Sequence, residues 1–172
     1  MNPDLTPLFS RRSIRAYKPD TIPEEMITDM LQAAMSAPSA VARDPWEFIV
    51  VQNKQTLEKI SAALPNGKFL ADAPLGIVVC GNLRQTHDGQ ISYLLQDCAA
   101  AVENMLLAAN LLGLGACWLG VHPRDERVQH LRAQFSLPEH IIPVATIAVG
   151  HPDEEKEPRT RYNENAVHWE QW

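Results

Sequence analysis

The chain has 172 residues, of which 45% are hydrophobic, and this size and composition predict one globular domain spanning residues 1–172. Its formal net charge of −6 argues against non-specific nucleic-acid binding, because polyanions are held mainly by positively charged surfaces. Residues 1–15 contain no apolar signal region, and Cys80, Cys98 and Cys117 lie apart in apolar sequence, as buried thiols do. We therefore expect a cytoplasmic protein that neither spans a membrane nor binds nucleic acid.

The first half of the sequence alternates helical and extended patterns. A short helix is predicted over residues 3–12. The segment from Thr21 to Glu24 has the pattern of a capping box, and the apolar residues after it have the spacing of a one-sided helix that ends at Ala37-Pro38-Ser39. The patterns that follow predict a strand at 46–51, a helix at 54–64 and a strand at 75–80.

The second half centres on a long segment, Ile91 to Gly113, that is apolar on nearly every face. Such a pattern predicts a helix in the middle of the protein. A membrane span is the alternative, but Asp97, Glu103 and Asn104 would be costly inside a bilayer. Beyond this helix the sequence predicts a strand at 116–119, a helix at 124–135 and a strand at 143–150.

Residues 151–172 form a polar arm that contains prolines and ends in Val167-His168-Trp169-Glu170-Gln171-Trp172. Disordered tails are depleted in tryptophan, so the two indoles indicate that the arm packs on a surface. Two interpretations are open. The arm docks on its own domain, or it embraces a second subunit.

Several common site motifs are missing or lie in the wrong context. Gly113-Leu114-Gly115 follows a helix and enters a strand, the reverse of the order in a dinucleotide-binding fingerprint, and is interpreted as a turn. The six histidines lack metal-ligand spacing, and the sequence contains neither a nucleophile elbow nor a P-loop. Neither a metal ion nor a catalytic side chain is predicted.

Arginines gather in two windows, one near each end of the chain: Arg11, Arg12 and Arg15, and Arg159 and Arg161. A guanidinium group presents several donors in a fixed planar fork and keeps its charge, so the first window, with the Ser13 hydroxyl, suits a phosphate or another anion. The alternative is a solvated basic turn, since helix C-termini favour basic residues.

Five motifs, in order over nearly the whole chain, resemble those of the nitroreductase family. They are Arg11-Arg12-Ser13-Ile14-Arg15; Ala37-Pro38-Ser39-Ala40 with Pro45-Trp46-Glu47-Phe48; Asp97-Cys98-Ala99-Ala100 with Glu103-Asn104-Met105; Gly113-Leu114-Gly115-Ala116-Cys117-Trp118-Leu119-Gly120; and Gly150-His151-Pro152 with Pro158-Arg159-Thr160-Arg161.

The resemblance implies an α+β fold in which helices flank a central, mostly antiparallel sheet. It also implies a domain-swapped homodimer with two FMN sites at the subunit interface, and a C-terminal arm, residues 151–172, that packs on the partner subunit. The two basic windows would then meet at one flavin phosphate, which carries close to two negative charges near neutral pH.

The resemblance also implies roles for individual residues. The phosphate and ribityl end of FMN would be held by Arg11, Arg12, Ser13, Arg15, Arg159 and Arg161. Three residues would approach the flavin from the partner subunit: Pro38, Ser39 and Ala40. The backbone at Leu119 and Gly120 would face the isoalloxazine ring.

One segment departs from the family pattern. Many members carry Gly-Asn and then Gln after the Pro-Ser-Ala motif, where this chain has Val41, Ala42, Arg43 and Asp44. Arg43 is therefore the candidate for a contact with the substrate. The chain is also short for the family, which implies that the insertions forming a lid or pocket wall in larger members are reduced.

The activity that the resemblance implies is that of an NAD(P)H-dependent flavin oxidoreductase. In a ping-pong sequence, NAD(P)H reduces FMN, leaves, and is replaced by a small organic acceptor such as a nitroaromatic or a quinone. Because the cofactor carries the chemistry, the protein needs no acid/base pair. Two alternatives stay open: a flavin-dependent dehalogenase or flavin-fragmenting enzyme on the same fold, and a non-enzymatic flavin-binding module.

Overall fold

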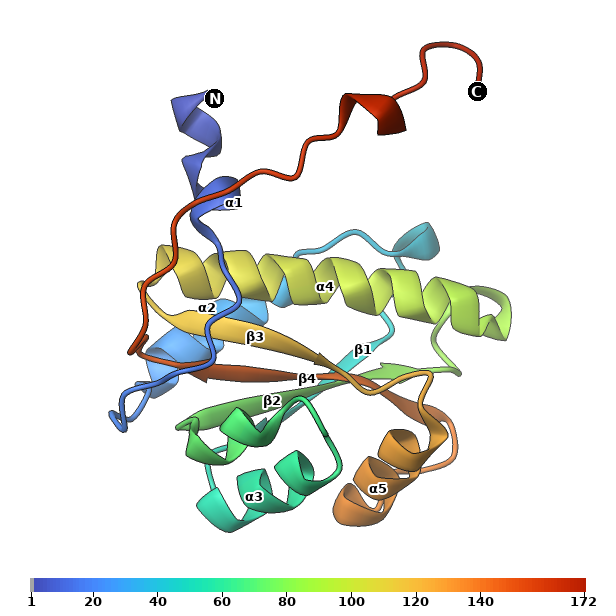
Figure 1. Ribbon diagram of the computed structural model, residues 1–172. Helices are drawn as coiled ribbons and strands as arrows, with labels where there is room; N and C mark the ends of the chain where they lie inside the picture. Colours follow the sequence, from blue (N-terminus) through green and yellow to red (C-terminus); the bar gives the residue numbers. More distant parts are fainter. Residues whose placement is uncertain (1) are drawn as a thin grey trace.

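A four-stranded antiparallel sheet forms the centre of the computed structural model, which describes residues 2–172 (Figure 1). The strand order is β1-β2-β4-β3, so β1 and β3 are the edge strands. The strands are β1 (Trp46–Val51), β2 (Leu75–Asn82), β3 (Gly115–Gly120) and β4 (Ile141–Gly150). The expected α+β fold with an antiparallel sheet is confirmed.

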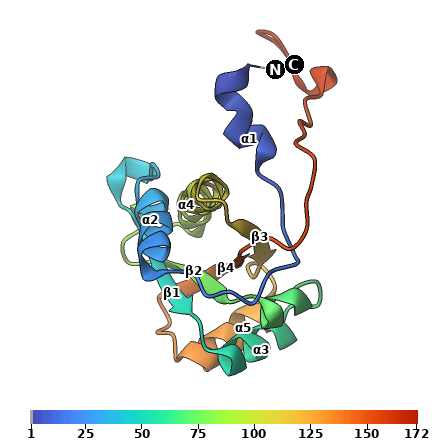
Figure 2. The same ribbon diagram turned by 90° about the vertical axis from the view of Figure 1, so that its left-hand side faces the viewer.

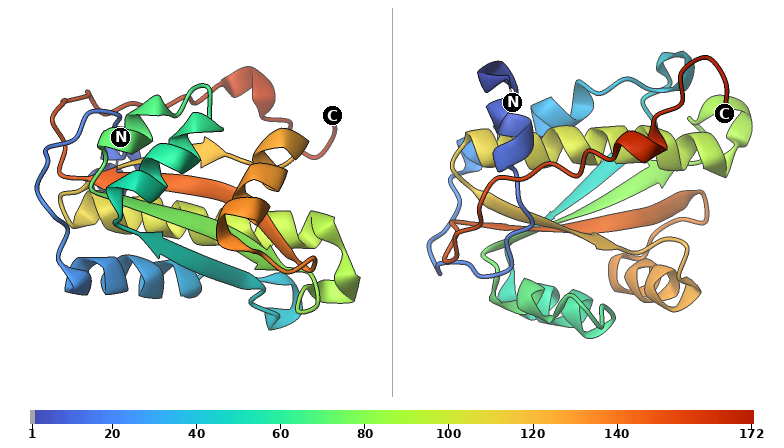
Figure 3. Two further views of the ribbon diagram at one scale, coloured as in Figure 1. Left: turned by 90° about the horizontal axis from the view of Figure 1, so that it is seen from below. Right: turned by 45° about the horizontal axis from the view of Figure 1, so that its top comes forward.

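Helices cover both faces of this sheet, which makes three layers. In chain order they are α1 (Thr6–Ser10), α2 (Glu24–Met35), α3 (Lys54–Ala62), α4 (Ile91–Leu111) and α5 (Asp125–Phe135). Helices α2 and α4 lie on one face, and α3 and α5 lie on the other (Figures 1 and 3). The shorter 3-10 turns are Pro3–Leu5, Ala40–Ala42, Lys68–Asp72, His87–Gly89 and Glu164–Ala166.

The central strand β2 shows why the sheet has two apolar cores. Its side chains alternate between the faces: Leu75, Ile77 and Val79 pack with α2 and α4, whereas Val78 and Cys80 pack with α3 and α5. All five are buried. Burial of each large apolar side chain contributes about 1.5–3 kcal/mol, so a strand that is apolar on both faces is stable only between two helical layers.

Two expectations need correction. The side chain of Thr21 does not cap α2, because the N-cap position is Pro23 and no side chain accepts a bond from the first turn. The long helix α4 is covered by its own chain on one side only, and its other side leaves Tyr93 and Leu111 exposed. Within residues 2–172 no helix, α4 included, combines the length and apolar character that a bilayer crossing requires.

The two ends of the chain leave the three-layer body together. Helix α1 and the segment after β4 project on the same side, next to one another (Figure 2). The Arg159 N–H donates to the Phe9 carbonyl at 3.1 Å, which joins the two segments. Further along, Trp169 is 84% exposed and Trp172 is fully exposed, so neither indole packs on the body of its own chain.

Candidate functional site

The two arginine windows come together in space. One surface hollow is lined by Leu8, Arg11, Arg12, Ser13, Arg159 and Arg161. Backbone contacts hold the windows at this spacing, since the Arg159 N–H binds the Phe9 carbonyl and the Arg12 guanidinium donates to the Glu157 carbonyl. We call this the arginine hollow.

The arginine hollow carries an excess of positive charge. Repulsion from Arg161, and then from Arg12, lowers the pKa of Arg159, although a guanidinium stays charged at neutral pH. One carboxylate reduces this charge, because Arg11 Nε lies 3.2 Å from Glu103 Oε1 of α4. Cations held close together against their mutual repulsion suit a multiply charged anion such as a phosphate.

A clamp from the C-terminal segment fixes the first window against the sheet. Glu154 Oε1 accepts the Arg15 N–H at 2.5 Å and binds Lys156 Nζ at 2.7 Å. Lys156 Nζ in turn donates to the Ser13 carbonyl at 2.6 Å. These bonds, to Lys156 first and to the Arg15 backbone second, lower the pKa of Glu154. The Ile14 N–H donates to the Ala116 carbonyl of β3 at 3.1 Å.

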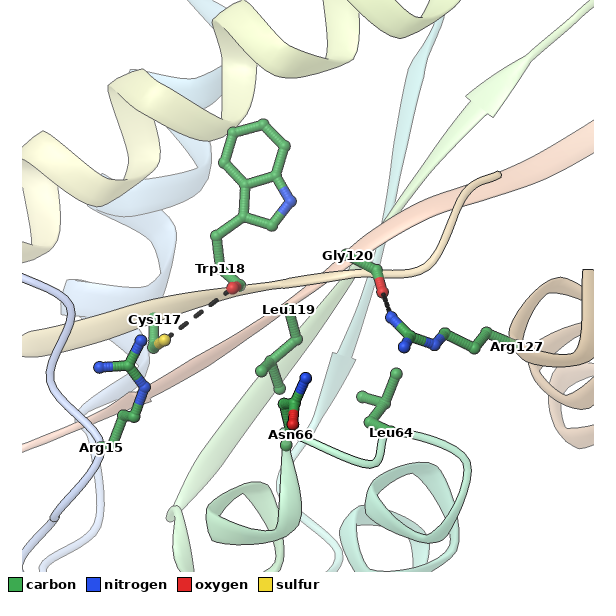
Figure 4. A pocket seen from close by; sticks show the side chains of 9 residues that line it. Arg15, Leu64, Asn66, Cys117, Trp118, Leu119, Gly120 and Arg127 are labelled. Atoms are coloured by element: carbon green, nitrogen blue, oxygen red, sulfur yellow. Dashed lines mark hydrogen bonds between the residues drawn. The ribbon is translucent and has the colours of Figure 1, made fainter. Parts of the chain in front are cut away.

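A second hollow runs along the open edge of β3, and we call it the strand hollow. It has a volume of about 260 Å³ and is lined by Arg15, Leu64, Asn66, Gly67, Cys117, Trp118, Leu119, Gly120 and Arg127 (Figure 4). Successive side chains of β3 alternate, so Leu119 points toward Asn66 while Trp118 points to the opposite side. The predicted pair Leu119 and Gly120 thus belongs to one hollow.

The floor of the strand hollow depends on a glycine. A Cβ at Gly67 would lie 2.9 Å from the Leu64 Cβ and 3.1 Å from the Leu119 Cδ1, so a larger residue would push these walls apart. Burial raises the pKa of the Cys117 thiol, which keeps this wall of the hollow uncharged at neutral pH. Leu119 and the neutral Cys117 make this wall apolar, and the strand edge beside it offers backbone hydrogen bonds.

Arg15 lines the strand hollow and not the arginine hollow. Its guanidinium bonds the Ser13 carbonyl at 3.5 Å and lies 6.0 Å from the centre of the Phe69 ring. The structure therefore divides the basic residues of the first window between two hollows. Ser13 and Arg15, which are two residues apart, connect them.

The loop from Pro38 to Asp44 lines neither hollow of its own chain. The Ala40 N–H donates to Oδ1 of the buried Asp97 of α4 at 2.9 Å. Ser39 Oγ accepts the Asp44 N–H at 2.9 Å and donates to the Asp44 carboxylate. In one chain, Pro38, Ser39, Ala40 and Arg43 are thus separated from the other predicted site residues.

Besides Gly67 and the apolar lining residues other than Leu119, four polar or charged residues of the site escaped the sequence analysis: Asn66, Arg127, Glu154 and Lys156. Asn66 precedes a glycine in a loop, which is an ordinary turn signal. The other three are charged residues in polar stretches, and nothing in their spacing distinguishes them from a solvated surface. The only sequence signal that could have drawn attention to Glu154 and Lys156 is their place in the segment after β4, which also holds Arg159 and Arg161.

Known proteins are similar to this chain in both sequence and fold. The sequence profile of the nitroreductase family matches residues 8–66 and 60–151. A protein of Methanothermobacter thermautotrophicus with the provisional name NADH dehydrogenase/NAD(P)H nitroreductase is 44% identical over 168 residues, 98% of this chain and 87% of that protein. A crystal structure from Parabacteroides distasonis with the same provisional name has a TM-score of 0.93 at 36% identity, covering 100% of both chains.

A third similar protein was solved with a ligand. It is a provisionally named nitroreductase of Desulfovibrio desulfuricans in complex with FMN, 28% identical to this chain, with a TM-score of 0.85. The match covers 100% of this chain and 99% of that one. Motifs, fold and profile therefore agree, and the chain belongs to the nitroreductase family.

Proposed function

We propose that this protein is an FMN-dependent oxidoreductase that transfers electrons from NAD(P)H to a small organic acceptor, such as a nitroaromatic or a quinone. The observation that carries the proposal is the arginine hollow, in which basic groups from both ends of the chain gather, together with the strand hollow on the edge of β3. Related proteins named NAD(P)H nitroreductase, and one solved with FMN, support the same chemistry.

The two hollows would take the two ends of FMN. The arginine hollow would hold the phosphate through Arg11, Arg12, Ser13, Arg159 and Arg161. The strand hollow would hold the ring system, with the backbone at Leu119 and Gly120 along it and Arg15 between ring and phosphate. When bound, FMN would take up hydride from NAD(P)H and pass electrons to the acceptor.

The protein would contribute binding, orientation and charge. Its fixed cations cost no reorganisation when negative charge develops on the ligand, which is where preorganised electrostatics contribute most. The neutral Cys117 thiol keeps one wall of the strand hollow apolar. Because donor and acceptor would use the same face of the flavin in turn, the kinetics would be ping-pong.

We also propose that two copies of the chain build each site. The side of α4 that its own chain leaves uncovered exposes Tyr93 and Leu111, and the C-terminal arm exposes Trp169 and Trp172. A second copy would cover both surfaces. Its loop would then bring Pro38, Ser39 and Ala40 to the flavin and Arg43 to the acceptor.

The test begins with the purified protein. We expect visible flavin absorption, or its appearance after reconstitution with FMN, and bleaching by NADH or NADPH without oxygen. An added quinone should then restore the oxidised spectrum and sustain NAD(P)H consumption. A colourless protein that cannot be reconstituted would refute the proposal, and bound FMN without acceptor-dependent turnover would reduce it to a flavin-binding module.

A further inference from the structure

Arg127 stands at the end of the strand hollow opposite Arg15. It belongs to the first turn of α5, and its Nη1 donates to the Gly120 carbonyl at 2.7 Å, where β3 ends. Figure 4 shows the two guanidinium groups on either side of Leu119 and Asn66. The strand edge between them is the part of β3 that lines the hollow.

The packing of α5 does not require this arginine. The helix is held to the sheet by its buried residues Val128 and Leu131, and the end of β3 is paired with β4 through Gly120 and Ala145. Asp125 and Glu126 precede Arg127 in the helix and line a neighbouring hollow with it. Within residues 2–172, Arg127 forms no salt bridge, so its charge is not neutralised by contact with a carboxylate.

We propose that Arg127 is a positioning residue that also tunes the reduction potential of the cofactor. Its bond to the Gly120 carbonyl fixes the last peptide of the strand edge, and its charge lies beside the place where the ring would bind. This inference rests on the proposed function. A reduced flavin in its anionic form carries more negative charge than the oxidised one, so a fixed cation favours the reduced form.

The charge can be separated from the hydrogen bond by substitution. Arg127→Gln retains an N–H donor for the Gly120 carbonyl and removes the charge, whereas Arg127→Lys retains the charge. Arg124→Gln is the matched control, because it removes one charge from the same stretch of chain, and Arg124 lines the neighbouring hollow but not the strand hollow. Arg127→Met, which removes both properties, is a second test if the Gln variant does not fold.

The readouts are the Kd for oxidised FMN, from quenching of flavin fluorescence, and the reduction potential of the bound flavin. In Arg127→Gln we expect affinity for reduced FMN to fall about tenfold more than affinity for oxidised FMN. That ratio corresponds to a potential lower by about 30 mV for a two-electron couple. The Lys variant and the Arg124→Gln control should retain the parent potential.

The outcomes separate this inference from the function on which it rests. Wild-type protein that binds no FMN would refute both. Wild-type protein that binds FMN, with a potential unchanged in Arg127→Gln, would refute the role of Arg127 alone. An equal shift in Arg124→Gln would also refute it, because the effect would then come from net charge and not from this position.

Discussion

Protonation of Glu154 should weaken the first arginine window more directly than protonation of any other carboxylate of the site. Its carboxylate holds the backbone of Arg15 and the side chain of Lys156, and its pKa lies below the ordinary 4.5. A carboxyl group with a depressed pKa contributes stability above its ordinary value, and that contribution is lost as pH falls through the folded-state pKa. The clamp on the first arginine window is therefore intact at neutral pH and fails in acid.

This predicts the behaviour of Glu154→Gln. Because charge-assisted bonds are lost, its affinity for FMN at pH 7 should fall by about tenfold. The affinity of wild-type protein should decline below pH 4.5, whereas the variant should show less of this decline. Fluorescence titration across pH measures both, and Glu155→Gln, at the exposed neighbouring position, is the control. A variant that matches wild type at every pH would show that the clamp does not support the site.

The arginines could be predicted from the sequence, and their clamps could not. Two windows of basic residues are easy to recognise in a chain with a net negative charge. Folding then places Arg12 and Arg161 in one hollow. Glu154 binds the backbone N–H of Arg15, which is far away in sequence, and Arg127 binds the Gly120 carbonyl across a turn between a strand and a helix, and both contacts exist only after folding. Residue type and spacing therefore contain no record of them.

At the scale of elements, the loop after α2 is the most strained part of the chain. Val41, Ala42 and Asp44 have φ values of 49°, 53° and 48°, the left-handed region that side chains disfavour. Val41 is β-branched and 65% exposed, so no burial offsets its strain. Contacts of Ser39 with Asp44, and of Ala40 with Asp97, hold the loop in this shape. Strain of this kind gathers at functional sites.

We predict that Val41→Gly stabilises the protein. Removing the side chain relieves a left-handed conformation that costs about 1–2 kcal/mol, partly offset by the greater backbone freedom of glycine in the unfolded chain. The expected net gain is about 0.5–1 kcal/mol, which raises Tm by roughly 1–4 °C for a domain of this size. Thermal unfolding of wild type, Val41→Gly and Val50→Gly as a strand control measures it. A lower Tm in Val41→Gly would contradict the strain.

Periodicity located the elements, and neighbouring contacts decided their ends. The strand over residues 46–51 was predicted with its observed bounds, because aromatic and β-branched residues mark it clearly. Strand β4 begins at Ile141, two residues before the predicted Pro143, because Ile142 pairs with Gly81 of β2. Helix α2 begins without the expected cap because Pro23 occupies the N-cap position and accepts no bond through its side chain.

At the scale of the whole molecule, α1 and the C-terminal arm project from the body without a core of their own (Figures 1 and 2). Stacking of His168 on Trp172, with ring centres 4.3 Å apart, gives the arm local order but buries little apolar surface. The sequence indicated that the arm needs a surface to pack on. The residues of the arm alone do not show which surface it packs on, because a second copy of the chain offers the same apolar side chains as the arm's own domain.

A double substitution of Trp169 and Trp172 by Ala tests the arm. Indoles are frequent centres of binding energy in interfaces, so we expect the dimer to weaken by about 2 kcal/mol or more, roughly 30-fold in Kd. Light scattering across a dilution series measures the dissociation of the dimer. The double variant Tyr162→Ala with Val167→Ala is the control, because it shortens two smaller side chains of the same arm. A wild-type protein that stays monomeric at high concentration would contradict the proposed shared site.

The most direct test of the account compares FMN with riboflavin, which has the same ring system and no phosphate. If the arginine hollow holds the phosphate, flavin-free protein should bind FMN about 100-fold more tightly than riboflavin, from roughly 3 kcal/mol of charge-assisted bonds. In Arg161→Ala this preference should shrink to about tenfold, because one charge-assisted bond is lost. Equal affinities for the two flavins in wild-type protein would contradict the assignment of the arginine hollow.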